Sequence, residues 1–348
     1  MIFFLNVLYV KIKEGKQIGK FNKIFCMVDL EEIFNGYIAK VPLSKSNILK
    51  DNKDNLKINK YNKKKKLTEN IRNHIIARKI RRIVNEKNID GIILADEIVK
   101  NEDFVNKLIL KKKLDVKKFV KERNIFFFDG NGLFKYIIYE VLEYIINIQN
   151  RRLELEDIYI IANNIDEIML NNITFLSTKF KNINIFSKNI EKYKYVEDFV
   201  YNNTGNNVIL LNNKRKSLKR AKYIINVDND VKELNEYLIY RKAIIININN
   251  SKNKITLVGF EGIIINSFEI DVGSKVKQIL EQYKLNSITN MATLYESFFN
   301  KKENFWNVRS KIEDAGLIVT KLYGNNGIID ENEYKRVNLN DNEVKKYY

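Results

Sequence analysis

The sequence predicts an α/β protein whose main sheet is doubly wound and mainly parallel, with a smaller, basic α/β region on its N-terminal side. Short apolar runs recur between residues 125 and 248, and they are continuous rather than alternating. Continuous runs are typical of strands buried on both faces, as parallel sheets require. Segments with helical periodicity separate many of these runs, and this alternation is typical of doubly wound sheets.

Between residues 157 and 248 we expect five strands, all parallel. They are 158–162, 182–186, 207–211, 222–227 and 242–248, and a short strand at 125–129 precedes them. Helical spacing of apolar residues predicts a long helix over 133–149. A second helix follows Asn164. A third, around Tyr193, is expected to end at Gly205, because glycine tolerates the left-handed conformation that closes many helices.

The flanking regions are less regular. The apolar start at residues 1–10 is too short to span a membrane and has no basic segment before it, so we expect a core strand. Residues 44–67 are polar and basic, which predicts a linker or long loop, with a nucleic-acid-binding arm as the alternative. A helix is expected from about Thr68. The predicted organisation is an N-terminal region over 1–124, the parallel-sheet domain over 125–258, and a C-terminal extension over 259–348 that packs on them.

The charge of the chain is strongly positive. A formal net charge of +18 favours a polyanionic partner such as a nucleic acid, although an AT-rich genome also produces a bias toward Lys, Asn, Ile, Tyr and Phe. The charge is concentrated in residues 50–82, 107–123 and 211–222. Cys26 is the single cysteine and His74 the single histidine of the sequence. These counts exclude an internal disulfide and the usual zinc ligand sets. We therefore expect a cytoplasmic protein with no membrane partner and no metal.

Two motifs carry a resemblance to a known family. FDGNGLF at 128–134 opens a long helix, and AKYIINVDND at 221–230 places Asn226 after an apolar strand. In this order of elements, residues 125–250 resemble the shikimate dehydrogenase-like branch of Rossmann domains. The resemblance implies a fold in which a glycine-rich turn after the first strand holds the pyrophosphate of NAD(P) at a helix N-terminus. It also implies a substrate-contacting role for Asp129, with helix capping as the alternative.

The glycine-rich turn itself is missing. Residues 162–164 read ANN, so Cβ atoms occupy the phosphate niche, and Asp166 and Glu167 add negative charge to the first helical turn. Lys45 stands in a motif like that of the family's catalytic lysine, but too few residues precede it to build the family's substrate domain. No catalytic residue is therefore assigned.

Candidate cofactor-binding residues are the polar ones at the carboxyl ends of the strands, where open α/β sheets bind ligands. They are Asn163, Asn164, Ser187, Lys188, Asn189, Asn212, Asn213, Lys214, Asn226 and Asp228. Lys188, after the second strand, favours NADP over NAD, because a basic residue there accommodates the 2′-phosphate. The alternative for each residue is turn formation, since a chain with 1 Pro and 13 Gly must make many turns with Asn.

These features predict a degenerate Rossmann-like protein that binds a nucleotide or small metabolite weakly or not at all and has a structural or regulatory role. An NADP-linked dehydrogenase is the first alternative, and it requires bound cofactor despite the missing glycines. A nucleic-acid-binding protein is the second, and it requires the three basic segments to lie on one surface.

Overall fold

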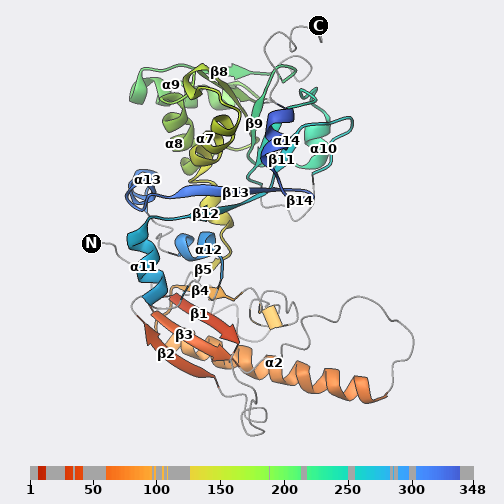
Figure 1. The fold of residues 1–348 in the computed structure, drawn as a ribbon, viewed down its shortest axis with the longest axis vertical. Helices are drawn as coiled ribbons and strands as arrows, with labels where there is room; N and C mark the ends of the chain where they lie inside the picture. Colours follow the sequence, from red (N-terminus) through yellow and green to blue (C-terminus); the bar gives the residue numbers. More distant parts are fainter. Residues whose placement is uncertain are drawn as a thin grey trace. The chain divides into compact units, whose positions relative to one another are not determined.

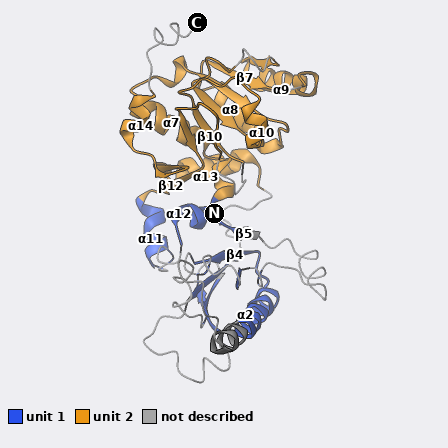
Figure 2. Cartoon of the chain, turned by 90° about the vertical axis from the view of Figure 1, so that its right-hand side faces the viewer, with its two compact units in different colours: residues 1–130, 274–302 blue, residues 131–273, 303–348 orange. Residues whose placement is uncertain are grey.

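The chain forms two compact units, each built from two separate segments (Figure 2). Unit 1 comprises residues 1–130 and 274–302, and unit 2 comprises residues 131–273 and 303–348. The computed structural model describes residues 7–12, 28–33, 36–41, 60–95, 98, 104–105, 108, 126–187, 189–212, 218–249, 255–282, 285, 289–297 and 303–337. Residues 259–348 are thus divided between the two units.

Unit 1 contains a five-stranded sheet with the order β2-β3-β1-β4-β5 (Figure 1). Its strands are β1 (Val7–Ile12), β2 (Asp29–Ile33), β3 (Gly36–Val41), β4 (Gly91–Leu94) and β5 (Phe126–Phe128). β1 is parallel to β3 and β4, β4 is parallel to β5, and β2 pairs with β3 in the antiparallel sense. The side chains of residues 7–10 are buried, which confirms a core strand near the N-terminus.

Helix α2 (Lys60–Glu86) buries Ile76, Ala77 and Ile80 in unit 1. It begins well before Thr68, where the helix was expected to start. The reason is local: residues 60–67 contain neither Pro nor Gly, and Lys and Leu are good helix formers. The end of the expected linker is therefore helical, whereas residues 42–59 lie outside the described residues. Helices α11 (Ser274–Gln282) and α12 (Met291–Glu296) also belong to this unit.

Unit 2 contains a six-stranded sheet with the order β11-β10-β9-β6-β7-β8. Its strands are β6 (Asp157–Ile161), β7 (Asn182–Phe186), β8 (Val208–Leu211), β9 (Tyr223–Asn226), β10 (Ile244–Asn247) and β11 (Ile263–Ile265). Each of these pairings is parallel. Numbered along the unit, the order is 6-5-4-1-2-3, which is the Rossmann strand order. The five expected parallel strands are confirmed, and β11 adds a sixth.

The helices of unit 2 follow the prediction in part. α8 (Glu167–Ser177) connects β6 to β7, α9 (Lys194–Thr204) connects β7 to β8, and the short α10 (Val231–Asn235) connects β9 to β10. α9 ends at Gly205, whose φ of 73° confirms its expected role. The single helix expected over 133–149 is instead α6 (Asn131–Phe134) and α7 (Ile138–Ile148). The Leu133 carbonyl accepts the N–H groups of both Tyr136 and Ile137, and this tight turn separates the two helices.

A smaller antiparallel sheet, β12-β13-β14, belongs to the same unit. β12 (Ser267–Asp271) follows β11 closely, and β13 (Ile318–Gly324) forms a hairpin with β14 (Gly327–Ile328). Helix α13 (Phe305–Asp314) precedes the hairpin, and α14 (Glu331–Arg336) follows it.

A buried ion pair anchors α13 to the helices of the large sheet. Arg309 Nη1 donates to Glu140 Oε1 of α7 at 2.7 Å, and the two side chains are 4% and 9% exposed. The guanidinium carbon also lies 4.5 Å from the centre of the Phe175 ring of α8. Burial raises the pKa of the Glu140 carboxyl, and the adjacent Arg309 offsets this effect only in part. Each buried charge therefore depends on its partner.

We predict that Arg309→Ala lowers the free energy of unfolding by about 3–5 kcal/mol, because it leaves the Glu140 charge buried and unpaired. Glu140→Leu combined with Arg309→Met should cost much less, since no charge is left behind. Lys194→Ala, which breaks the exposed pair with Glu191, is the control and should leave the urea midpoint unchanged. Urea denaturation of the three variants measures these differences. An Arg309→Ala midpoint equal to that of Lys194→Ala contradicts the prediction.

Candidate functional site

We refer to the carboxyl ends of β6 and β9 in the large sheet as the crevice, after the place where such sheets bind ligands. The strand order reverses between these two strands, and open α/β sheets bind their ligands at such a point. The loop after β6 carries Asn163 and Asn164, and the loop after β9 carries Asp228. The topology therefore brings three of the predicted site residues to one place.

Asp228 bonds the two backbone N–H groups of the loop after β6. Asn163 N–H donates to Asp228 Oδ1 at 2.7 Å, and Asn164 N–H donates to Asp228 Oδ2 at 2.8 Å. In dinucleotide-binding domains, the N–H groups of this loop and of the following helix face the pyrophosphate. In this chain the N–H groups of Asn163 and Asn164 donate to a carboxylate of the protein.

Two more charged side chains hold the same loop. Asn163 Nδ2 donates to both carboxylate oxygens of Glu233 at 3.0 and 3.1 Å. On the other side, Lys192 Nζ donates to the Asn163 carbonyl oxygen at 2.9 Å and to Asn164 Oδ1 at 2.7 Å. The loop is thus bonded to segments on both sides of β6, from the β7–α9 connection to α10.

The first turn of α8 is also capped from within the chain. Asp166 Oδ1 accepts the Met169 N–H at 2.8 Å, and Asp166 Oδ2 pairs with Lys135 Nζ at 2.8 Å. Partial burial raises the pKa of the Asp166 carboxyl, but the bonds from Lys135 and Met169 outweigh it and leave the pKa below its usual value. The N-terminus of a helix favours negative charge, and at α8 this charge is supplied by the Asp166 carboxylate.

A row of asparagine amides continues along the same edge of the sheet. Asn226 Nδ2 donates to Asn247 Oδ1 at 2.9 Å, Asn247 Nδ2 to Asn266 Oδ1 at 3.0 Å, and Asn266 Nδ2 to Asn325 Oδ1 at 2.9 Å. Asn226 Oδ1 also accepts the Asn229 N–H at 3.2 Å. The Asn226 amide, expected as a ligand contact, is therefore used inside the fold. Sequence reasoning missed the other members, although an Asn ends or follows each of three isoleucine-rich strands.

Of the remaining predicted residues that the structure describes, Ser187 and Asn189 bond to each other. Ser187 Oγ accepts the Asn189 N–H and donates to the Asn189 carbonyl oxygen, both at 3.1 Å, so this pair forms a turn after β7. Asn212 follows β8 and is exposed. Lys188, Asn213 and Lys214 lie outside the described residues, as does much of the basic segments 107–123 and 211–222.

Asp129, the predicted substrate contact, lies in unit 1 and not in the unit that holds the crevice. Its backbone N–H donates to Glu296 Oε2 of α12 at 3.2 Å, and the N–H of Gly130 donates to the same oxygen at 2.7 Å. Two adjacent backbone N–H groups again share one carboxylate of the chain.

Within the described residues, no cluster of three or more His, Cys, Asp or Glu side chains is arranged to hold a metal ion. None of the described helices combines the length and the apolar character needed to cross a membrane.

No protein-family model and no curated protein matches the chain. Among solved structures, it is similar to L-tryptophan dehydrogenase from Nostoc punctiforme, with 9% sequence identity and a TM-score of 0.28, over 98% of this chain and 88% of that chain. The strand order of the six-stranded sheet assigns unit 2 to the Rossmann-like α/β class.

The depressed pKa of Asp166 makes stability depend on pH in a predictable direction. The ionised carboxylate stabilises the folded state above the unfolded-state pKa of about 3.9, and this contribution is lost as pH falls through the lower folded-state pKa. Urea denaturation should therefore show Asp166→Asn to be less stable than the wild type near neutral pH, with the difference shrinking below about pH 4. A difference that stays constant into strong acid contradicts the assignment.

Proposed function

We propose that unit 2 is a Rossmann-like domain whose phosphate-binding position is closed by carboxylates of the chain, and that the protein has a structural or regulatory role in the cytoplasm. The observation that carries this proposal is the pair of bonds from the Asn163 and Asn164 N–H groups to Asp228. The single cysteine supports the compartment, since it leaves no internal disulfide.

An incoming pyrophosphate would gain little at this position. It would take over two N–H groups that already have a charged acceptor, so the number of hydrogen bonds would not rise. It would also meet the charges of Asp228 and Glu233, and two like charges about 4 Å apart repel by ~1 kcal/mol in water and ~4 kcal/mol near a protein surface. Exchange of the carboxylate for a phosphate is therefore unfavourable overall.

The dehydrogenase alternative has less support. The likeness of FDGNGLF and AKYIINVDND to the shikimate dehydrogenase-like branch concerns the order of elements, and the side chains at the crevice are bonded to one another. Asn226 donates to Asn229 and Asn247 and accepts from Asn229, which leaves little of its amide for a ligand. The preference for NADP rests on Lys188 alone and stays a prediction.

We predict that the purified protein binds NAD and NADP no more tightly than about millimolar, since the acceptor position is filled and acidic. Isothermal titration calorimetry measures both affinities. Micromolar binding of NADP that is lost in Lys188→Glu would make the dehydrogenase alternative the better account.

Removing the two carboxylates should open the position. We expect Asp228→Ser combined with Glu233→Gln to bind inorganic pyrophosphate at least about tenfold more tightly than the wild type, because two N–H groups become free for an anion. Gln at 233 can keep the capping box of α10. Asp157→Ser is the matched control, since Asp157 also accepts a bond from an asparagine but lies at the amino end of β6. Equal affinities in all three proteins, with circular dichroism showing intact folding, contradict the proposal.

A further inference from the structure

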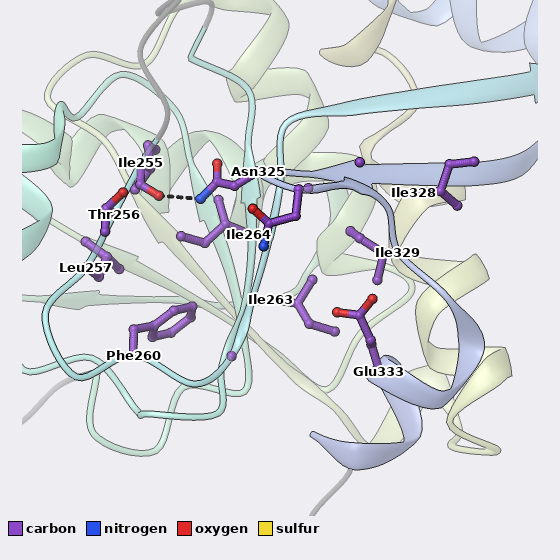
Figure 3. A pocket seen from close by; sticks show the side chains of 14 residues that line it. Ile255, Thr256, Leu257, Phe260, Ile263, Ile264, Asn325, Ile328, Ile329 and Glu333 are labelled. Carbon is purple, nitrogen blue, oxygen red and sulfur yellow. Dashed lines mark hydrogen bonds between the residues drawn. The ribbon is translucent and has the colours of Figure 1, made fainter.

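A cavity of about 200 Å³ lies in unit 2 beside β11, outside the crevice residues described above. Its walls are the loop 255–260, strand β11, the turn of the β13–β14 hairpin and the start of α14 (Figure 3). Gly262 and Gly324 line it without side chains. A Cβ on Gly262 would lie 2.0 Å from the Ala243 carbonyl oxygen, so the close packing of the chain requires glycine there.

Apolar side chains line part of the cavity, while more than half of the surface that the cavity exposes is polar. The lining includes Leu257, Phe260, Ile263, Ile264 and Ile329. The polar side of the wall is fixed by the amide row, because Asn325 Nδ2 donates to the Ile255 carbonyl oxygen at 2.6 Å while its Oδ1 accepts from Asn266. The cavity is therefore preformed by backbone and amide bonds on the side where the hairpin meets the loop.

One carboxylate lies near these apolar side chains. In Figure 3 the Glu333 side chain reaches from α14 toward Ile263 and Ile329. Glu333 Oε1 accepts the Asp330 N–H at a long 3.4 Å as part of the helix cap. Among the described residues, no Lys or Arg pairs with Glu333, and no basic residue lines the cavity. A cation is the natural complement of this carboxylate, and an anion is disfavoured.

We propose that this cavity binds a small primary amine that carries an apolar group of about the size of a phenyl ring. An apolar cavity of about 150 Å³ in another protein accepts benzene, so the volume here accommodates a phenyl ring and one further carbon. The ammonium donates to Glu333, and the ring lies against Phe260, Leu257 and Ile263. The lining of this site includes neither Asp228 nor Glu233. A failed test of this site therefore leaves the proposed closure of the phosphate position unaffected, and the reverse also holds.

The test is calorimetric titration of the full chain with benzylamine, and with benzyl alcohol as the neutral analogue of the same shape. We expect saturable binding of one benzylamine, weakened at least about tenfold in Glu333→Gln, because a charge-assisted bond is lost. Gln can keep the helix cap, so this variant should fold normally. Benzyl alcohol should bind weakly and equally to the wild type and to Glu333→Gln.

Two control variants complete the design. Glu331→Gln removes an exposed carboxylate from the same helix, outside the cavity, and should bind benzylamine like the wild type. Thr256→Trp should abolish binding by filling the exposed rim of the cavity. The proposal is overturned if the wild type shows no saturable binding, if benzyl alcohol binds as well as benzylamine, or if Glu333→Gln and Glu331→Gln bind alike.

Discussion

Two adjacent backbone N–H groups, those of Asn163 and Asn164, follow the first strand of the parallel sheet in the loop where the strand order reverses. Asp228 supplies their acceptor from the loop after β9, with one carboxylate oxygen for each group. The bonds of Asn163 to Glu233 and to Lys192 depend on the loop that Asp228 holds in place. In a dinucleotide-binding domain the ligand completes this edge of the sheet. Here Asp228 of the chain bonds both N–H groups at this edge.

In the part of the chain that the structure describes, few asparagines serve turns through positive φ, the purpose that composition suggests. With few glycines, Asn was expected to make turns through positive φ, yet among the described residues only Asn88 and Asn150 adopt it, against five glycines. The structure instead places Asn226, Asn247 and Asn266 at the ends of neighbouring strands, where each amide can both donate and accept. Asn290 and Asn304 cap helices. Hydrogen-bonding capacity, rather than conformational freedom, accounts for these positions.

The sequence predicted the five parallel strands because strands buried on both faces are continuously apolar. This pattern can be recognised in a single sequence. The sixth strand, β11, was not among the predicted strands, because the apolar run at 263–265 is followed closely by the alternating residues of β12. The sequence also predicted that Asn163, Asn164 and Asp228 lie at one edge of the sheet, because each follows the carboxyl end of a parallel strand. Periodicity carries no information about bonds from a backbone N–H group to a side chain 64 or 65 residues away, so the sequence suggested ligand contacts where the structure shows internal partners. Residues 274–302 group with unit 1 through tertiary packing, for which no local pattern exists.

The closure of the crevice by Asp228 is tested most directly by amide hydrogen exchange of the ligand-free protein, followed by nuclear magnetic resonance. Because both N–H groups donate to Asp228, the amides of Asn163 and Asn164 should exchange more slowly in the wild type than in Asp228→Ala. Asp157→Ala, at the other end of β6, should leave both rates unchanged. Equal exchange rates for these two amides in the wild type and in Asp228→Ala would contradict the account.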